Sequence, residues 1–214
     1  MEEIMHIAIT TAIAAIISYL AGAIPCGLLI GFYNGVDIRK VGSGNIGATN
    51  VTRSVSPLAG KLCFFCDFVK GMLPVLLVQA FIPGNPLAAI ICGLAAILGH
   101  MFPVYLKFKG GKGISTAAGV AIALAPLPLL TALAIWGAVF YISRYVSLAS
   151  IIAAVMLPVS AIIYALLKVG GSVATSRQTI IFFCIIAVLA VVKHTSNIKR
   201  LLNGTESRFE KKKK

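Results

Sequence analysis

The tetrapeptide Gly-Gly-Lys-Gly at positions 110–113 combines three glycines with one lysine between two long apolar segments. Glycines let backbone N–H groups come close to a ligand, and a lysine beside them adds positive charge for an anion. The flanking segments, 98–108 and 114–136, have the composition of membrane helices, so we expect this glycine loop to bind a phosphate at the edge of a bilayer. The substrate would then be part phosphate and part lipid.

A second polar segment, residues 42–53 (the first loop), carries glycines, hydroxyls, amides and one guanidinium. No acidic residue follows Asp37 in this region, so the hydrogen-bond donors have no competing carboxylate, which suits an anionic ligand. The alternative is a flexible polar linker, which would not need an arginine after so many donors. The candidate binding residues here are Ser43, Asn45, Gly47, Thr49, Asn50 and Arg53.

Three polar residues interrupt or end the apolar segments between these loops. Asp67 and Lys70 lie one helical turn apart among apolar residues. They form either a self-neutralising structural pair or a functional one, and we favour Asp67 as a residue that orients the first loop. His100 ends an apolar segment shortly before the glycine loop, so it is either a hydrogen-bonded structural group or part of the same site as Lys112.

A last polar stripe follows the C-terminal apolar segment, where His194, Asn197 and Arg200 recur at helical spacing. The alternative to a binding role is that these side chains only extend to the membrane interface. We expect Glu206 to anchor either Arg200 or Arg53.

The candidate residues are mostly donors, and few of them are suited to act as a strong carboxylate base. This argues against a paired-acid hydrolase and a two-metal phosphatase, because metal sites need clustered carboxylates. The chain has no Gly-x-Ser-x-Gly motif, and Lys112 is followed by Gly113, not by the Ser or Thr of a Walker loop. Such donors can position two phosphorylated molecules and stabilise developing negative charge, and we expect the donor-rich segments to share one face.

The composition indicates a polytopic membrane protein. The chain has 214 residues, of which 59% are hydrophobic and 12% charged, and its mean hydropathy is +0.97. One core of this size would not bury so much apolar surface, whereas bilayer-spanning helices of about 20 residues would. The apolar runs are continuous and do not alternate, which argues against an outer-membrane barrel.

Six apolar stretches predict an all-α fold with about seven transmembrane helices, some of them short or broken. The stretches are 4–33, 57–82, 86–108, 114–141, 145–167 and 179–192. Asp67, Lys70 and Gly71 interrupt the second stretch, so we expect two shorter helices there. We expect residues 1–214 to form a single membrane-embedded domain with a basic tail at about 207–214. The first stretch follows Glu2 and Glu3 and no basic segment, and is interpreted as a retained span, not a signal peptide.

The net charge of +13 comes from 19 Lys and Arg against 6 Asp and Glu. These cations lie in short loops and at the C-terminus, and no basic face carries interleaved aromatics, so we expect no nucleic-acid partner. The loops 34–56 and 107–113 and the C-terminal segment should face the cytoplasm, and lysines 211–214 either contact anionic lipid headgroups or are solvated.

This orientation requires one broken stretch, because six full crossings from an outside N-terminus would leave the C-terminus outside as well. The break falls either at 125–128, which holds two prolines, or at Pro158.

Five cysteines lie in apolar segments, and Cys63 and Cys66 have the spacing of a redox or metal motif. No second cysteine pair or nearby histidine completes such a site, so we expect a packing role and no metal.

Five motifs follow one another along the chain: SGNIGATNVTR at 43–53, DFVKG at 67–71, GHMFP at 99–103, GGKG at 110–113 and HTSNIKRLLNGTE at 194–206. Together they resemble the bacterial membrane acyl-phosphate:glycerol-3-phosphate acyltransferases, the PlsY family, over essentially the whole chain. The lysine-rich tail after Phe209 is not part of that pattern. The family lacks the His-x4-Asp pair of other glycerolipid acyltransferases, and here none of the three histidines has an aspartate five positions on.

The resemblance implies a seven-helix enzyme of the bacterial cytoplasmic membrane. The enzyme would transfer a fatty acyl group from acyl phosphate to the 1-hydroxyl of sn-glycerol 3-phosphate, which gives lysophosphatidic acid and phosphate, the first step of phospholipid synthesis. It would use neither acyl-CoA nor acyl carrier protein as donor, and neither metal nor cofactor. Its functional partners would be the enzyme that makes acyl phosphate and the next acyltransferase.

The resemblance also implies residue roles. Arg53, Ser43 and the amides of the first loop would hold one phosphate, and Lys112 with the backbone of Gly110, Gly111 and Gly113 would hold another and steady the reacting carbonyl. His194 and Asn197 would bind glycerol 3-phosphate or relay a proton, with Arg200 as a further binding residue. The base would be either His194 or the substrate's own phosphate, whose second pKa is about 6. Two other classes remain open, namely a membrane transporter of a phosphorylated small molecule and a structural membrane subunit.

Overall fold

The computed structural model describes residues 2–171 and 173–209, and over these residues it contains helices and no strand. The chain divides into two compact units, residues 1–124 and 125–214. The first unit holds α1 (Glu2–Ala23), α2 (Cys26–Tyr33), α3 (Ala48–Ser54), α4 (Pro57–Phe81), α5 (Pro86–Met101), a short 3-10 helix (Val104–Leu106) and α6 (Ile114–Leu124). The second unit holds α7 (Pro126–Ser143), α8 (Val146–Leu166), α9 (Arg177–Lys193) and α10 (Thr195–Leu202). The predicted all-α fold is confirmed. The lysine tail at 211–214 lies outside the described residues.

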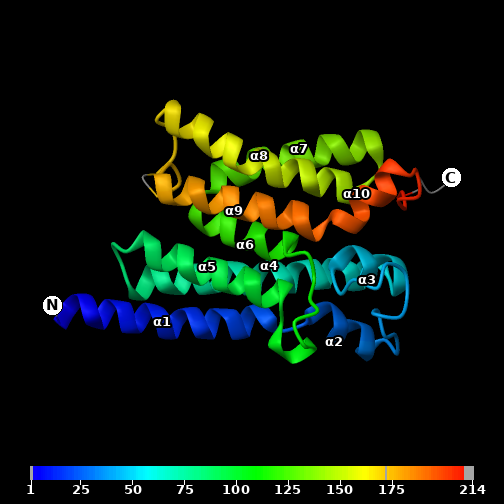
Figure 1. Cartoon of the computed structure of the whole chain (residues 1–214), viewed down its shortest axis with the longest axis horizontal. Helices are drawn as coiled ribbons and strands as arrows, with labels where there is room; N and C mark the ends of the chain where they lie inside the picture. The colour runs from blue at the N-terminus through cyan, green and yellow to red at the C-terminus, as the bar shows by residue number, and fades with distance from the viewer. Residues whose placement is uncertain (1, 172, 210–214) are drawn as a thin grey trace. The chain divides into compact units, whose positions relative to one another are not determined.

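Close helix contacts hold the first unit together, with α1 against α5 and α4 against both α5 and α6 (Figure 1). Glycines lie at these contacts, because a Cβ added at Gly22 would overlap the carbonyl of Ala96, and one at Gly71 would overlap the carbonyl of Thr116. Small residues of this kind let helices approach closely in lipid, where hydrophobic burial adds little to association.

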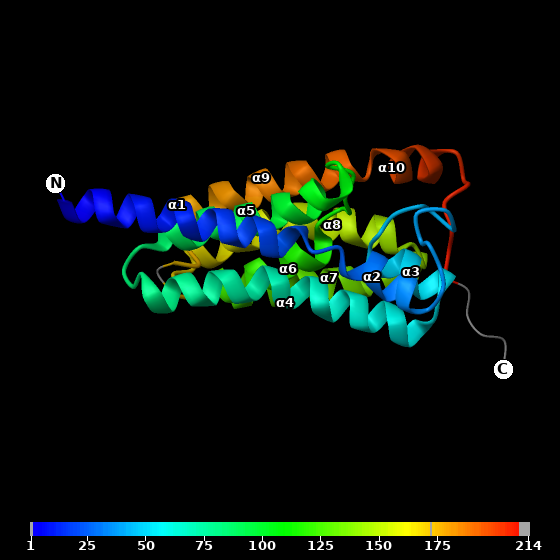
Figure 2. The same ribbon diagram turned by 90° about the horizontal axis from the view of Figure 1, so that it is seen from below.

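The two polar loops of the first unit contact each other. Helix α4 begins beside α2 and α3 (Figure 2), whereas α6 begins farther along α4, where Thr116 lies against Gly71. Leu106 of the segment 102–113 packs against the buried cluster that holds Ile38 and Ile46 of the segment 34–56. This contact agrees with the prediction that the lysines and arginines of both loops lie on the same side of a membrane.

Helix α4 corrects one prediction, because it runs unbroken for 25 residues through Asp67, Lys70 and Gly71. The expected break is wrong for a physical reason: Asp67 and Lys70 pair with each other on one face, and Gly71 fits closely against α6. The helix also continues through Pro74. A break occurs instead within the stretch 4–33, where Pro25 separates α1 from α2.

The fourth apolar stretch is broken at Ala125, between α6 and α7, which is one of the two predicted positions. Helix α8 continues through Pro158, so the other is wrong. Seven of the described helices have 11 or more residues, namely α1 and α4–α9. By length and composition, 5 described helices can cross a membrane, or 6 if the bent pair α9–α10 counts as one span.

In the second unit, α8 packs against both α7 and α9 (Figure 1). Polar side chains join these helices within apolar surroundings: Trp136 Nε1 donates to Ser150 Oγ at 3.1 Å, and Ser160 Oγ donates to the Pro128 carbonyl at 3.2 Å. The C-terminal segment returns to this unit, where Phe209 N–H donates to the Arg144 carbonyl at 3.0 Å.

Candidate active site

The first loop is organised around the buried amide of Asn50, which is 2% exposed. Its Oδ1 accepts from Ser43 N–H at 3.0 Å and from Ser54 Oγ at 3.4 Å. Its Nδ2 donates to the carbonyls of Ile38 at 2.8 Å and Val41 at 3.2 Å. Because these bonds occupy both ends of the amide, Asn50 shapes the loop.

The remaining first-loop candidates surround this amide. Asn45 Oδ1 accepts from Gly47 N–H at 2.9 Å, an Asx turn that leads into α3. Ser43 and Arg53 are exposed, and Thr49 is half-buried one turn before Arg53 on α3. Apolar side chains fix the whole segment, because Ile38, Ile46 and Val51 pack in one buried cluster with residues of α2 and α4. The loop thus presents hydroxyl and guanidinium donors from a fixed backbone.

The glycine loop folds back over the end of α5. Gly111 N–H donates to the His100 carbonyl at 3.1 Å, and a Cβ at Gly111 would overlap His100 Nε2. Gly113 has φ +80°, a value that favours glycine, and it directly precedes α6. The half-buried Lys112 therefore lies next to the N-terminus of α6, which carries partial positive charge. This geometry confirms that His100 lies beside the glycine loop.

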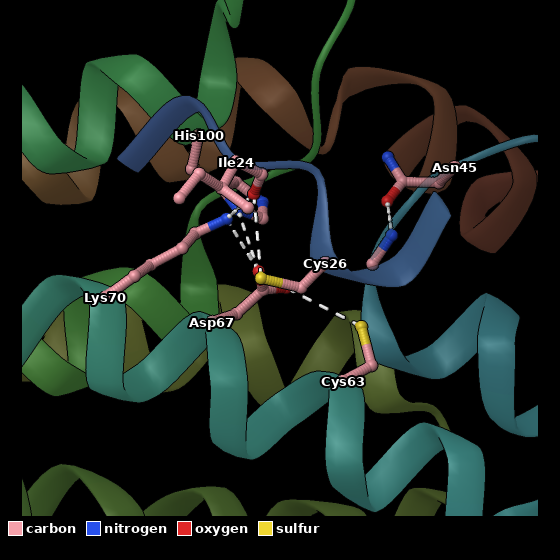
Figure 3. A network of polar contacts seen from close by, with 8 residues as sticks. Ile24, Cys26, Asn45, Cys63, Asp67, Lys70 and His100 are labelled. Atoms are coloured by element: carbon pink, nitrogen blue, oxygen red, sulfur yellow. Dashed lines mark hydrogen bonds and ion pairs between the residues drawn. The ribbon is translucent and has the colours of Figure 1, made fainter. Parts of the chain in front are cut away.

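Asp67 lies at the centre of a polar network with Lys70 and His100 (Figure 3). Its Oδ1 is 2.7 Å from Lys70 Nζ and 3.5 Å from His100 Nδ1, and its Oδ2 accepts from Cys63 Sγ at 3.7 Å. Lys70 Nζ also donates at 2.7 Å to the carbonyl of Ile24, in the break between α1 and α2. We expected Asp67 to orient the first loop, but its described contacts lead through His100 to the glycine loop.

In the second unit, Glu206 gathers the polar residues of α10. Its Oε1 accepts from Ser147 Oγ at 2.6 Å and from Asn197 Nδ2 at 2.7 Å, and its Oε2 accepts from Arg200 Nε at 2.7 Å. Of the two partners predicted for Glu206, the structure confirms Arg200. Ser147 is a partner that sequence reasoning missed, because it lies 59 positions away on α8 with no local signal.

His194 lies at the junction of α9 and α10, where the two helices meet at 57°. Its ring is buried, with Nδ1 2.7 Å from the Ala190 carbonyl. A carbonyl only accepts, so Nδ1 carries the proton, and in the neutral ring the lone pair is on Nε2. Nε2 is therefore the atom with which His194 would accept a proton or a substrate hydrogen bond.

Carboxylates near these loops are poor bases at neutral pH. Asp37 accepts from Arg39 Nε and Nη2, both at 2.9 Å, and these hydrogen bonds lower the pKa of Asp37 to about 2. Burial alone would raise the pKa of Glu206, but hydrogen bonds from Ser147, Asn197 and Arg200 outweigh burial and lower it. A carboxyl whose pKa is far below the operating pH accepts a proton inefficiently. Among the residues that the structure describes, no three His, Cys, Asp or Glu side chains lie together as a metal site requires.

The pKa of Glu206 leads to a prediction about stability. Because its folded pKa lies below the ordinary value of 4.5, Glu206 contributes stability above about pH 4.5, and this contribution is lost as the pH falls through the folded pKa. We expect Glu206→Gln to lower the free energy of unfolding by roughly 1.5–3 kcal/mol, near the lower end because Arg200 is 38% exposed. Thermal unfolding of the detergent-solubilised protein at pH 7 and pH 4 measures this.

The difference in unfolding temperature between wild type and Glu206→Gln should be smaller at pH 4 than at pH 7. The exposed Glu3, at the start of α1, provides a matched control, because Glu3→Gln should leave the unfolding temperature unchanged at both values. A Glu206→Gln difference that stays constant between pH 7 and pH 4 would contradict the assigned carboxylate interactions.

Comparisons with known proteins point to one family. The sequence model of the family described as glycerol-3-phosphate acyltransferase matches residues 12–204. A glycerol-3-phosphate acyltransferase of Desulforamulus reducens is 45% identical over 206 residues, which cover 96% of this chain and 98% of the relative. One of Aquifex aeolicus is 43% identical over 195 residues, which cover 91% and 96% of the two chains.

Two solved structures are similar to this chain along most of its length. Both are crystal structures of PlsY (YgiH), described as an integral membrane glycerol 3-phosphate acyltransferase, and each comparison covers 94% of this chain and 96% of the other. The glycerol 3-phosphate form is 39% identical with a TM-score of 0.85, and the lysophosphatidic acid form is 38% identical with a TM-score of 0.83.

Proposed function

The chain belongs to the glycerol-3-phosphate acyltransferase family of integral membrane enzymes, and we propose that its acyl donor is acyl phosphate. The reaction transfers a fatty acyl group to the 1-hydroxyl of sn-glycerol 3-phosphate. Its products are lysophosphatidic acid and inorganic phosphate. The lysophosphatidic acid form of the related PlsY structure supports this product.

One observation carries the proposal: the polar loops are rich in donors, while their carboxylates are already bonded to cations. Asp37 is held by Arg39, and Glu206 is held by Arg200. The first loop and the glycine loop add Ser43, Arg53 and Lys112 without a further acid. This chemistry favours anionic substrates and the stabilisation of developing negative charge.

Ser43 and Arg53 of the first loop bind one phosphate in this proposal. Lys112 and the N–H groups of Gly110 and Gly113 bind a second phosphate on the acyl side and stabilise the carbonyl oxygen as it becomes negative, while Gly111 N–H donates to the His100 carbonyl. The hydroxyl oxygen of glycerol 3-phosphate attacks the acyl carbon, a new C–O bond forms, and the C–O bond to the phosphate then breaks. These residues position the reactants and stabilise charge, and need not react covalently themselves.

In the second unit, His194 and Asn197 bind glycerol 3-phosphate in this proposal, and Glu206 fixes the orientation of the Asn197 amide. The hydroxyl proton passes to a substrate phosphate, whose second pKa of about 6 leaves it mostly dianionic at neutral pH. The low pKa of both Asp37 and Glu206 supports a base other than these carboxylates.

We further propose that residues 1–214 work as one membrane-embedded domain in a bacterial cytoplasmic membrane, with the polar loops towards the cytoplasm. Most lysines and arginines of the first unit lie in the segments 34–56 and 102–113, which supports this orientation. An enzyme that makes acyl phosphate must supply the donor, and a second acyltransferase would consume the lysophosphatidic acid.

The deciding experiment incubates the purified protein with acyl phosphate and glycerol 3-phosphate and follows both released phosphate and lysophosphatidic acid. We expect the two products in equal amounts, and no lysophosphatidic acid when acyl-CoA replaces acyl phosphate. Turnover with acyl-CoA alone would overturn the donor assignment. A transporter would instead show counterflow of glycerol 3-phosphate across proteoliposomes without any acylated product.

A further inference from the structure

The polar network of Asp67, Lys70 and His100 lies buried against the glycine loop. Asp67 and His100 are 1% and 4% exposed, and the Lys70 side chain is 8% exposed. Charged groups at such depth are costly even when paired, and inside membrane segments they generally have a functional role. Three hydrophobic residues would pack here at a lower cost in folding free energy. We therefore expect the polar residues to have a role beyond packing.

His100 connects this network to the glycine loop through two contacts. Its backbone carbonyl accepts from Gly111 N–H at 3.1 Å, and its ring lies so close that a Cβ at Gly111 would overlap Nε2. On the other side of the ring, Nδ1 is 3.5 Å from Asp67 Oδ1 (Figure 3). The ring is thus held between a carboxylate and a glycine.

Asp67 and Lys70 restrict how this ring can turn. Asp67 attracts Nδ1, which leaves Nε2 on the side of Gly111. Lys70 holds Asp67 Oδ1 at 2.7 Å and is itself fixed by the Ile24 carbonyl, also at 2.7 Å. The orientation of His100 therefore depends on α4 and on the break between α1 and α2.

We propose that Asp67, Lys70 and His100 are positioning residues, which hold the His100 ring as the support that sets the backbone conformation of the glycine loop. The inference rests on the proposed function in one respect, namely that the glycine loop binds the phosphate group of a substrate. The network then controls the affinity of that one phosphate site, while none of its three side chains needs to touch the substrate.

A pair of substitutions tests whether the ring supports the loop. Gly111→Ala should raise the KM for one of the two phosphorylated substrates about 100-fold, because the added methyl group displaces the loop from the ring. His100→Ala alone should raise the same KM about tenfold. The double variant should match His100→Ala alone, because removing the ring makes room for the methyl group. Independent effects would instead multiply to about 1000-fold, which would overturn the proposal.

Gly22→Ala provides the matched control for added volume. Its Cβ would overlap the Ala96 carbonyl where α1 meets α5, so it should lower the unfolding temperature. Both KM values should stay within about threefold of wild type, and His100→Ala should not rescue its stability. Rescue of Gly22→Ala by His100→Ala would show that the ring acts only on overall packing.

A second set of variants distinguishes a role in positioning the glycine loop from the effect of buried charge on stability. Asp67→Asn leaves Lys70 without its buried counter-ion and should lower stability, whereas Asp67→Asn combined with Lys70→Met removes both charges and should restore it. The KM for the one substrate should stay raised about tenfold in the double variant, with a much smaller change in kcat. If KM returned to wild type together with the unfolding temperature, the network would be purely structural.

Binding of glycerol 3-phosphate and of a non-hydrolysable acyl phosphate analogue, measured by calorimetry, completes the test without turnover. The Kd for one of these two ligands should rise in the same variants, and by similar factors, as the KM for the corresponding substrate. Absent turnover in the wild type would contradict the proposed function alone, whereas unchanged Kd values for both ligands in Gly111→Ala would contradict this inference alone.

Discussion

Lys112→Ala is expected to lower kcat/KM by about 10²–10³-fold, which corresponds to about 2.7–4 kcal/mol of transition-state stabilisation. Lys112 lies within the glycine loop, directly before Gly113 and the N-terminus of α6. Its ammonium group would act together with the helix terminus on the oxygen that becomes negative as the carbonyl carbon turns tetrahedral. Initial rates with acyl phosphate and glycerol 3-phosphate measure the loss.

Lys109→Ala is the matched control for this prediction. Lys109 lies three residues earlier and is exposed, so its removal takes one positive charge from the same loop without reaching the site. We expect Lys109→Ala to change kcat/KM by less than about threefold, in line with exposed charges in general. Near-normal turnover of Lys112→Ala, or equal losses in both variants, would contradict the role given to Lys112.

His194→Ala is expected to lower kcat/KM by about 10²-fold and to leave a measurable residual rate. If a substrate phosphate accepts the hydroxyl proton, the logarithm of that residual rate should be flat against pH above roughly 7, where the phosphate is fully ionised. The imidazole would then contribute orientation through Nε2, since Nδ1 is engaged by the Ala190 carbonyl.

The same variant can give the opposite answer about the base. Complete loss of turnover, with unchanged binding of both substrates, would make His194 the general base. His6→Ala serves as the control, because His6 is exposed near the start of α1 and should leave activity unchanged. A pH profile for the wild type, measured beside both variants, separates a general loss of activity from a lost ionisation.

The sequence predicted the membrane class and the helical fold, because these follow from local composition. Apolar runs locate helices, and glycines with nearby cations remain candidate anion sites. The sequence could not predict features that depend on contacts with residues far along the chain. The polar residues in 67–71 indicated a break, but His100 on α5 contacts Asp67, Gly71 packs against α6, and α4 continues unbroken through them.

The roles of individual amides show the same limit. From the sequence alone, Asn50 and Asn45 are equally good candidates to bind a ligand. In the folded loop, Asn50 is turned inwards by the carbonyls of Ile38 and Val41, while Asn45 closes a local turn. Likewise, Glu206 could be matched with an arginine from spacing, but not with Ser147 on another helix. Side-chain direction is decided by tertiary contacts, which a single sequence does not contain.

The shortness of α6 has a consequence for the position of the glycine loop along α4. Its 11 residues rise only about 16 Å, roughly half of a hydrocarbon core about 30 Å thick. Gly71 lies against Thr116, and Gln79 Nε2 donates to the Ala123 carbonyl at 3.3 Å, so α6 runs beside the last part of α4 and ends close to the end of that helix. The glycine loop at the start of α6 therefore lies beside the middle of α4, roughly 20 Å along the helix from Pro57. A longer α6 would reach back towards the start of α4, so its shortness leaves the glycine loop beside Asp67, Lys70 and Gly71.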